Sequence, residues 1–187
     1  MSIIYLGLRA SLLLIAAVVL GLSVSLAQHQ VIGQVPAETG FSTFVGAAGF
    51  FISAVGMALL WFDRFNESIM IVLDAIMSSF YLAASICLTL AMKNVSSCTS
   101  TDPNLEYIRV TNNILSGGCV TNAANKGPVC SHAFTDDGTD LTPSRCEMAR
   151  ASYVFQYVGF IASFAMVCVG YLMSRRGRGG TPAPSYH

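Results

Sequence analysis

Four of the six cysteines lie in one polar segment of the chain: Cys98, Cys119, Cys130 and Cys146. An even number of thiols in an oxidising compartment is typical of a disulfide framework, and four cysteines allow three pairings. We favour Cys98 with Cys146, because this bond would join the two apolar stretches that flank the segment, and the other pairings stay open. Zinc is the alternative, but the sequence contains no C-x-x-C spacing. We therefore predict two disulfide bonds and no metal or other cofactor.

Two charged residues lie where long apolar stretches begin. Arg9 precedes the uncharged run Ala10–Ala27, and Asp74 precedes the uncharged run Ala75–Met92, which has the same length. If both runs cross a bilayer, the two charges lie at a similar depth, and carboxylates at such positions are rare and usually functional. We predict an Arg9–Asp74 ion pair that fixes helix register. The alternatives are a proton or cation relay through Asp74 and an Asp74 side chain that reaches water.

Small residues recur at helical spacing in the second apolar stretch. The steps of four, three, four and three place them on one face of a helix, and the stripe consists of Ser42, Gly46, Gly49, Ser53 and Gly56. Such a stripe lets helix backbones approach closely in lipid, where burial of apolar surface brings no hydrophobic gain. We predict packing within a helix bundle, and the alternative is that the stripe faces another copy of the chain.

The end of the last apolar stretch fits a loose pattern proposed for sterol contact, formed by Val169, Tyr171 and Arg175. A simpler interpretation is that Tyr171 lies at a membrane interface and that Arg175 anchors the topology. The sequence offers no Ser/His/Asp or Cys/His set for nucleophilic catalysis and no phosphate-binding glycine loop. We therefore do not expect an enzyme.

The elements that position these residues follow from composition. Of 187 residues, 53% are hydrophobic and only 11% are charged, whereas a soluble domain carries about 25% charged residues. The net charge is zero, so a nucleic-acid partner is not expected. Four stretches are long enough for helices that cross a bilayer, at about residues 6–27, 41–62, 69–92 and 151–173.

Basic residues in the short flanks predict the orientation. Arg9, Arg64 and Arg175 lie on one side of the predicted spans, which the positive-inside rule assigns to the cytosol together with both termini. The loop 93–150 is then outside, and 174–187 is a disordered cytosolic tail. Residues 1–27 also imitate a cleavable signal peptide, whose removal would leave three spans.

The loop 93–150 is rich in Asn, Gly, Thr and Ser. Such a composition predicts turns, and we expect a small cap that buries little apolar surface and is held by its disulfide bonds.

Short fragments in a consistent order resemble fungal MARVEL-domain membrane proteins, including the non-classical export protein family. The resemblance covers nearly the whole chain and is carried by Gly7–Ala10, Val19–Ser23, Phe44–Gly46, Leu73–Ala75, Gly117–Cys119 and Ser144–Ala149. The long loop and the additional Cys130 depart from the family pattern.

The resemblance implies an M-shaped, four-helix protein of the plasma membrane without catalytic activity. Relatives organise membrane microdomains of the eisosome kind, respond to sphingolipid or sterol, and have a loose link to unconventional export. Our leading hypothesis is a non-enzymatic membrane-organising protein that self-associates, contacts other membrane proteins or binds lipid. The alternatives are a small transporter, a channel or an accessory subunit that uses Asp74, and an adaptor whose loop binds a partner protein.

Overall fold

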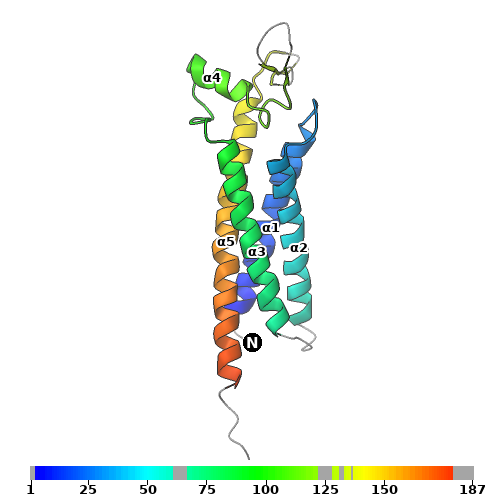
Figure 1. Ribbon diagram of the computed structural model, residues 1–187, viewed down its shortest axis with the longest axis vertical. Helices are drawn as coiled ribbons and strands as arrows, with labels where there is room; N and C mark the ends of the chain where they lie inside the picture. The colour runs from blue at the N-terminus through cyan, green and yellow to red at the C-terminus, as the bar shows by residue number, and fades with distance from the viewer. Residues whose placement is uncertain (1–2, 61–66, 122–127, 131–132, 136, 179–187) are drawn as a thin grey trace, which may run out of the picture.

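Four long helices form an up-and-down bundle (Figure 1). They are α1 (Ile3–Gln28), α2 (Ala37–Leu60), α3 (Glu67–Ala91) and α5 (Thr142–Arg178). The computed structural model describes residues 3–60, 67–121, 128–130, 133–135 and 137–178. Within these residues the same four helices are long and apolar enough to cross a membrane. The predicted all-α, four-span membrane fold is therefore confirmed.

The four helices pack as a closed ring. The main contacts join α1 to α2, α2 to α3, α3 to α5 and α5 to α1. Consequently α1 and α3 face each other across one diagonal, and α2 and α5 face each other across the other. The described ends of the chain, near Ile3 and Arg178, lie at the same end of the bundle (Figure 1).

The opposite end of the bundle carries a cap, which we define as the described residues between Ala91 and Thr142 (Figure 1). It contains the short helix α4 (Pro103–Val110) and an antiparallel pair of strands, β1 (Val120–Thr121) and β2 (Pro128–Val129). The start of α4 follows from local chemistry. The Asp102 carboxylate accepts a hydrogen bond from Asn104 N at 2.9 Å, and Pro103 needs no partner at the first helical position.

The last helix is longer than the predicted last span at both ends. The helix α5 begins at Thr142 rather than near 151, and it continues to Arg178 rather than ending near 173. Charged residues such as Arg145 and Arg150 interrupt the apolar run, so hydropathy underestimates a helix that projects beyond the span. The predicted loop 93–150 is therefore too long, and the predicted tail begins too early. Residues 61–62 of the predicted second span and 179–187 of the tail lie outside the described residues.

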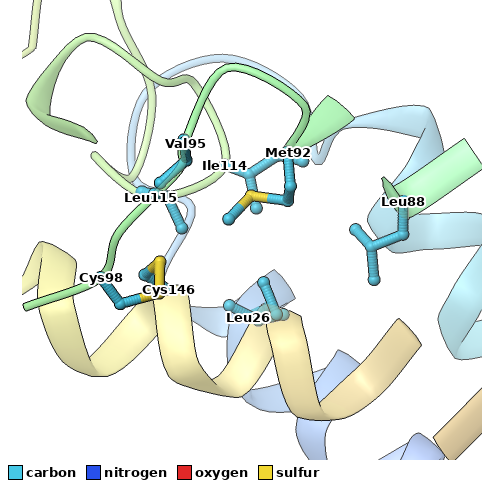
Figure 2. Packing of buried hydrophobic residues seen from close by; sticks show 9 residues of the cluster. Leu26, Leu88, Met92, Val95, Cys98, Ile114, Leu115 and Cys146 are labelled. Atoms are coloured by element: carbon cyan, nitrogen blue, oxygen red, sulfur yellow. A yellow bond between two sulfur atoms is a disulfide. The ribbon is translucent and has the colours of Figure 1, made fainter. Parts of the chain in front are cut away.

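A cluster of large apolar side chains lies where the cap meets the bundle (Figure 2). Cap and helix residues contribute together, and the buried members are Leu26, Leu88, Met92, Val95, Cys98, Ile114, Leu115, Cys146 and Ala149. Leu115 is fully buried. Our expectation that the loop buries little apolar surface was wrong, because its few aliphatic residues are gathered on the helix ends.

Candidate functional site

The side chains of Arg9 and Asp74 form a two-pronged ion pair inside the bundle. Arg9 Nη1 donates to Asp74 Oδ1 at 2.9 Å, and Nη2 donates to Oδ2 at 2.7 Å. The two residues are only 1% and 4% exposed. Arg9 Nη2 also donates to the hydroxyl of Tyr5 at 3.2 Å, whose ring lies 5.5 Å from the guanidinium carbon. Parallel, charge-assisted bonds of this kind are among the strongest in proteins.

This ion pair joins α1 to α3, the two helices that face each other across a diagonal of the ring. Gly56 of α2 leaves the necessary space, because a Cβ atom at this position would lie 3.2 Å from Arg9 Cζ. Both carboxylate oxygens of Asp74 already accept hydrogen bonds from Arg9. The geometry therefore suits a lock between opposite helices better than a site that binds a cation.

The small-residue stripe of α2 faces the bundle interior. A Cβ atom at Gly46 would lie 2.8 Å from Leu20 N of α1, and one at Gly49 would collide with the hydroxyl of Tyr81 of α3. The remaining stripe residues are also inward: Ser42 is 1% exposed, Ser53 is 5% exposed, and Gly56 faces Arg9. The structure thus uses this stripe for packing within one chain.

Tyr81 fills the centre of the bundle and was not identified from the sequence. Its hydroxyl lies against Gly49 of α2, and its ring edge would lie 3.1 Å from a Cβ atom at Gly159 of α5. The ring therefore occupies the space between the two helices on the second diagonal. No local pattern in the sequence identifies Tyr81, because the two glycines that it contacts lie on other helices.

A second polar link in the interior was also missed. The hydroxyls of Ser23 (α1) and Ser152 (α5) lie 3.2 Å apart, and Gln156 Nε2 donates to Ser152 Oγ at 3.2 Å. In span four, residues Ser152, Gln156, Gly159 and Ser163 are all buried and recur at steps of four, three and four. Gly159 and Ser163 already show this spacing in the sequence, and extending it toward the cap would have included Gln156 and Ser152.

Two disulfide bonds hold the cap. Cys98 is bonded to Cys146 and Cys119 to Cys130. The first bond ties the chain leaving α3 to the first turns of α5, in agreement with the pairing that we favoured.

Arg109 is a further buried charge in the cap, and it is only 3% exposed. Its guanidinium donates to Ser100 O at 2.7 Å, to Thr142 Oγ1 at 3.4 Å and to the Asp140 carboxylate at 3.4 Å. Arg109 therefore fastens α4 to the start of α5. Sequence reasoning did not find this residue, because an arginine in a polar loop resembles any exposed cation.

The chain matches the family model described as MARVEL, membrane-associating domain, over residues 3–169. The chain belongs to the MARVEL family. No curated protein and no solved structure matches it. MARVEL is a membrane-associating, non-enzymatic kind of domain. Among the residues that the structure describes, no group of three or more His, Cys, Asp or Glu side chains could hold a metal ion.

The cap of this MARVEL protein also docks on the connection between α1 and α2. The backbone amides of Val31 and Ile32 donate to Gly117 O at 2.8 and 3.0 Å. Gly118 adopts a positive φ of 109°, and a Cβ atom here would collide with Ile32 O. Only glycine fits this position. Gly118 therefore lets the cap pack directly against the α1–α2 connection at this end of the MARVEL bundle.

The residues of the predicted sterol pattern lie near the free end of α5. The guanidinium carbon of Arg175 lies 5.3 Å from the centre of the Tyr171 ring. Tyr171 is 51% exposed, whereas Val169 is partly buried. The three residues therefore share one helix end, with the aromatic ring turned outward.

Proposed function

We propose that this MARVEL protein is a non-enzymatic organiser of microdomains in the plasma membrane. The observation that supports it is the direction of the side chains in the four spans. Many polar side chains of the spans turn inward, and Arg9 and Asp74 are paired with each other across the bundle. Large apolar side chains turn outward on every span, among them Leu14, Phe51, Val72 and Ile161, each more than half exposed. A protein built this way acts through its contacts with lipid and with neighbouring proteins.

We further propose that both termini are cytosolic and that the cap faces outward. The disulfide bonds of the cap support this orientation, because disulfides persist in oxidising compartments. Arg9 and Arg175 lie toward the opposite end of the bundle, as the positive-inside rule expects for the cytosolic side. The eisosome-like setting, the response to sphingolipid or sterol, the link to unconventional export and the fungal affiliation rest on the sequence resemblance alone.

Self-association is part of the proposal and needs a face other than the α2 stripe, which is covered. On α3, residues Ala75, Ser79, Ala83 and Cys87 recur at steps of four and are all exposed. Small residues on an exposed helix face permit close approach of a second helix. We therefore assign the contact between copies to this outward face of α3.

Oxidative cross-linking tests this contact with native thiols, because Cys87 and Cys168 are both free and exposed. In native membranes, copper–phenanthroline should produce a covalent dimer that persists in Cys168→Ser and disappears in Cys87→Ser. The Cys168→Ser variant is the matched control, since its thiol lies on α5. Absence of any Cys87-dependent dimer would contradict self-association through α3.

Partition between lipid phases tests the organising function itself. In giant vesicles of sphingomyelin, sterol and unsaturated phosphatidylcholine, we expect the protein to concentrate in one phase or at the phase boundary. A uniform distribution would contradict the proposal.

The predicted sterol contact at Val169, Tyr171 and Arg175 is a finer part of the same proposal. A photoreactive sterol should label the end of α5 in the wild type and much less in Tyr171→Leu. A Tyr157→Leu variant, changed nearer the cap, should retain labelling.

A small transporter, a channel or an accessory subunit remains the second candidate. Its carboxylate would be Asp74, but both oxygens are bonded to Arg9, and this favours the lock. A pH-dependent flux in proteoliposomes that is lost in Asp74→Asn would favour the second candidate instead.

A further inference from the structure

The two disulfide bonds of the cap lie in different surroundings. Cys98 and Cys146 are 1% and 0% exposed, and both belong to the apolar cluster between the cap and the bundle (Figure 2). Cys119 and Cys130 are both partly exposed, and neither belongs to this cluster. Reduction of a disulfide requires a thiolate to attack one of the two sulfur atoms directly, so access to the sulfur limits the rate. A reductant in solution therefore reaches the Cys119–Cys130 bond first.

A hydrogen-bond donor lies beside one sulfur of the Cys119–Cys130 bond. Ser116 Oγ lies 3.1 Å from Cys119 Sγ, and the hydroxyl is the donor because a disulfide sulfur carries no hydrogen. A donated hydrogen bond favours the thiolate form of the sulfur that accepts it, and the more stable thiolate is the better leaving group in thiol–disulfide exchange. Cys119 is therefore the leaving sulfur, and Cys130 is the sulfur that an incoming thiolate attacks.

The segment that precedes Cys119 docks the cap on the connection between α1 and α2. Gly117 O accepts hydrogen bonds from the backbone amides of Val31 and Ile32 at 2.8 and 3.0 Å. Gly118 lies so close to Ile32 O that a Cβ atom would collide with it. Cys119 is the next residue of the chain, so a restraint on Cys119 also restrains this contact.

The disulfide bond supplies that restraint. Cys119 precedes β1 and Cys130 follows β2, so the bond closes the base of the hairpin. Each strand has only two residues, and a two-stranded hairpin alone is marginally stable in water. When the bond is broken, the chain regains the conformational freedom that a link over a sequence separation of 11 removes. The docked segment then loses its support on the side of Cys119.

We propose that the Cys119–Cys130 bond is a redox latch, which a dithiol reductant opens while the Cys98–Cys146 bond stays intact. One thiolate of the dithiol attacks Cys130 Sγ and forms a mixed disulfide with it, and Cys119 leaves as a thiolate and takes up a proton. The second thiolate of the dithiol then displaces Cys130, which is also protonated. The dithiol is thereby oxidised to its disulfide, and the two electrons and two protons that it gives up convert the protein disulfide into two thiols.

Opening the latch releases the cap from one of its two supports. The contact of Gly117 with Val31 and Ile32 loosens, whereas the Cys98–Cys146 bond still ties the cap to α5. The surface that the cap presents to its surroundings therefore changes in response to thiols on that side of the membrane. This regulation does not depend on which lipid or protein the spans contact.

Differential alkylation tests the order of reduction in the full-length protein in bicelles. The two free, exposed thiols are blocked first with N-ethylmaleimide, so that neither can exchange with a disulfide. Dithiothreitol is then added, and each time point is quenched with an excess of heavy-isotope N-ethylmaleimide for peptide mass spectrometry. Half-reduction of Cys119–Cys130 should need at least about tenfold less time than half-reduction of Cys98–Cys146. Reduction of both bonds at one rate, of Cys98–Cys146 first, or of neither bond would overturn the proposal.

A monothiol shows which sulfur is attacked. With glutathione, the mixed disulfide should form on Cys130, and Ser116→Ala should slow its formation severalfold without changing the reduction of Cys98–Cys146. A mixed disulfide on Cys119, or an unchanged rate in Ser116→Ala, would overturn the assignment of Cys119 as the leaving sulfur.

Hydrogen exchange tests what the latch holds. After selective reduction, the backbone amides of Val31 and Ile32 should exchange severalfold faster, while amides in the middle of the spans stay as protected as before. The Cys119→Ser/Cys130→Ser double variant is the matched control: it should show the faster exchange without reductant and no further change with it. Unchanged protection of Val31 and Ile32 after reduction would overturn the latch, even where the Cys119–Cys130 bond is reduced first.

Discussion

The bundle interior and its junction with the cap bury different mixtures of side chains. The bundle interior buries small and polar residues, including Ser42, Ser53, Ser152 and Gln156, together with apolar residues such as Met77. The junction with the cap is built instead from large aliphatic residues such as Leu88 and Leu115 (Figure 2). The difference follows from the solvent. In lipid, burial of an apolar side chain brings no hydrophobic gain, so close backbone packing and polar pairing hold helices together, whereas at the water boundary the hydrophobic effect acts again.

The two regions also treat buried charge differently. In the bundle, Arg9 is matched by one carboxylate through two short bonds. In the cap, the short bond of Arg109 is to the Ser100 carbonyl at 2.7 Å, while Thr142 Oγ1 and the carboxylate of Asp140, whose side chain is 21% exposed, both lie at 3.4 Å. Removal of the carboxylate should therefore lower the free energy of unfolding far more in the bundle than in the cap.

The largest expected effect is that of Asp74→Leu, because it leaves the Arg9 guanidinium buried without its counter-ion. We expect a loss of about 3–5 kcal/mol in the free energy of unfolding, measured by steric trapping in bicelles. The change in the cap is Asp140→Asn, which removes the charge but keeps the oxygen that accepts from Thr142 N, and it should cost about 1 kcal/mol or less. Equal losses would mean that the two regions do not differ in this way.

A somewhat smaller loss is expected when the cap loses its covalent tie. Cys98 and Cys146 are separated by 48 residues, and a disulfide of this kind typically contributes about 2–4 kcal/mol. The Cys98→Ser/Cys146→Ser double variant should unfold at a lower temperature, and hydrogen exchange should increase in the cap while the middle of the spans stays protected. Loss of protection throughout the bundle would show that the cap and the spans are one cooperative unit.

The smallest expected loss of stability comes from adding one methyl group to the inward face of a helix, compared with the same change on an outward face. Gly46→Ala places a methyl group against the backbone of Leu20, and it should cost about 1–3 kcal/mol through overpacking. Gly21→Ala on the outward face of α1 has no atom within 4 Å of the new methyl group and should be neutral or slightly stabilising. The same thermal unfolding assay measures both variants, and similar destabilisation by both would argue that Gly21 also faces a helix.

The number and type of spans could be predicted from the sequence because lipid imposes a simple rule, a long uncharged run for every crossing. The structure places Arg9 beside Asp74, as the matched runs after them suggested. The α2 stripe could also be predicted from the sequence, although spacing alone did not show whether it faced a helix of the same chain.

The features that were missed depend on contacts between distant segments. In the apolar cluster, Ile114 and Leu115 come from a polar segment and pack against the helix ends. No local sequence pattern predicts such a contact. The first turns of α5 were not predicted to be helical, because Arg145 and Arg150 interrupt the apolar run although the helix continues through them. Tyr81 and Gln156 were not predicted, because a neutral polar residue in an apolar stretch is a weaker signal than a charged one.

The most direct test of the account compares Arg9→Leu, Asp74→Leu and the double variant by steric trapping in bicelles. The central claim is that the polar interior of the bundle is closed by this ion pair. The double variant should then be more stable than Asp74→Leu alone, because no unpaired charge remains in the interior. A double variant that is as unstable as the sum of the two single variants would contradict the claim.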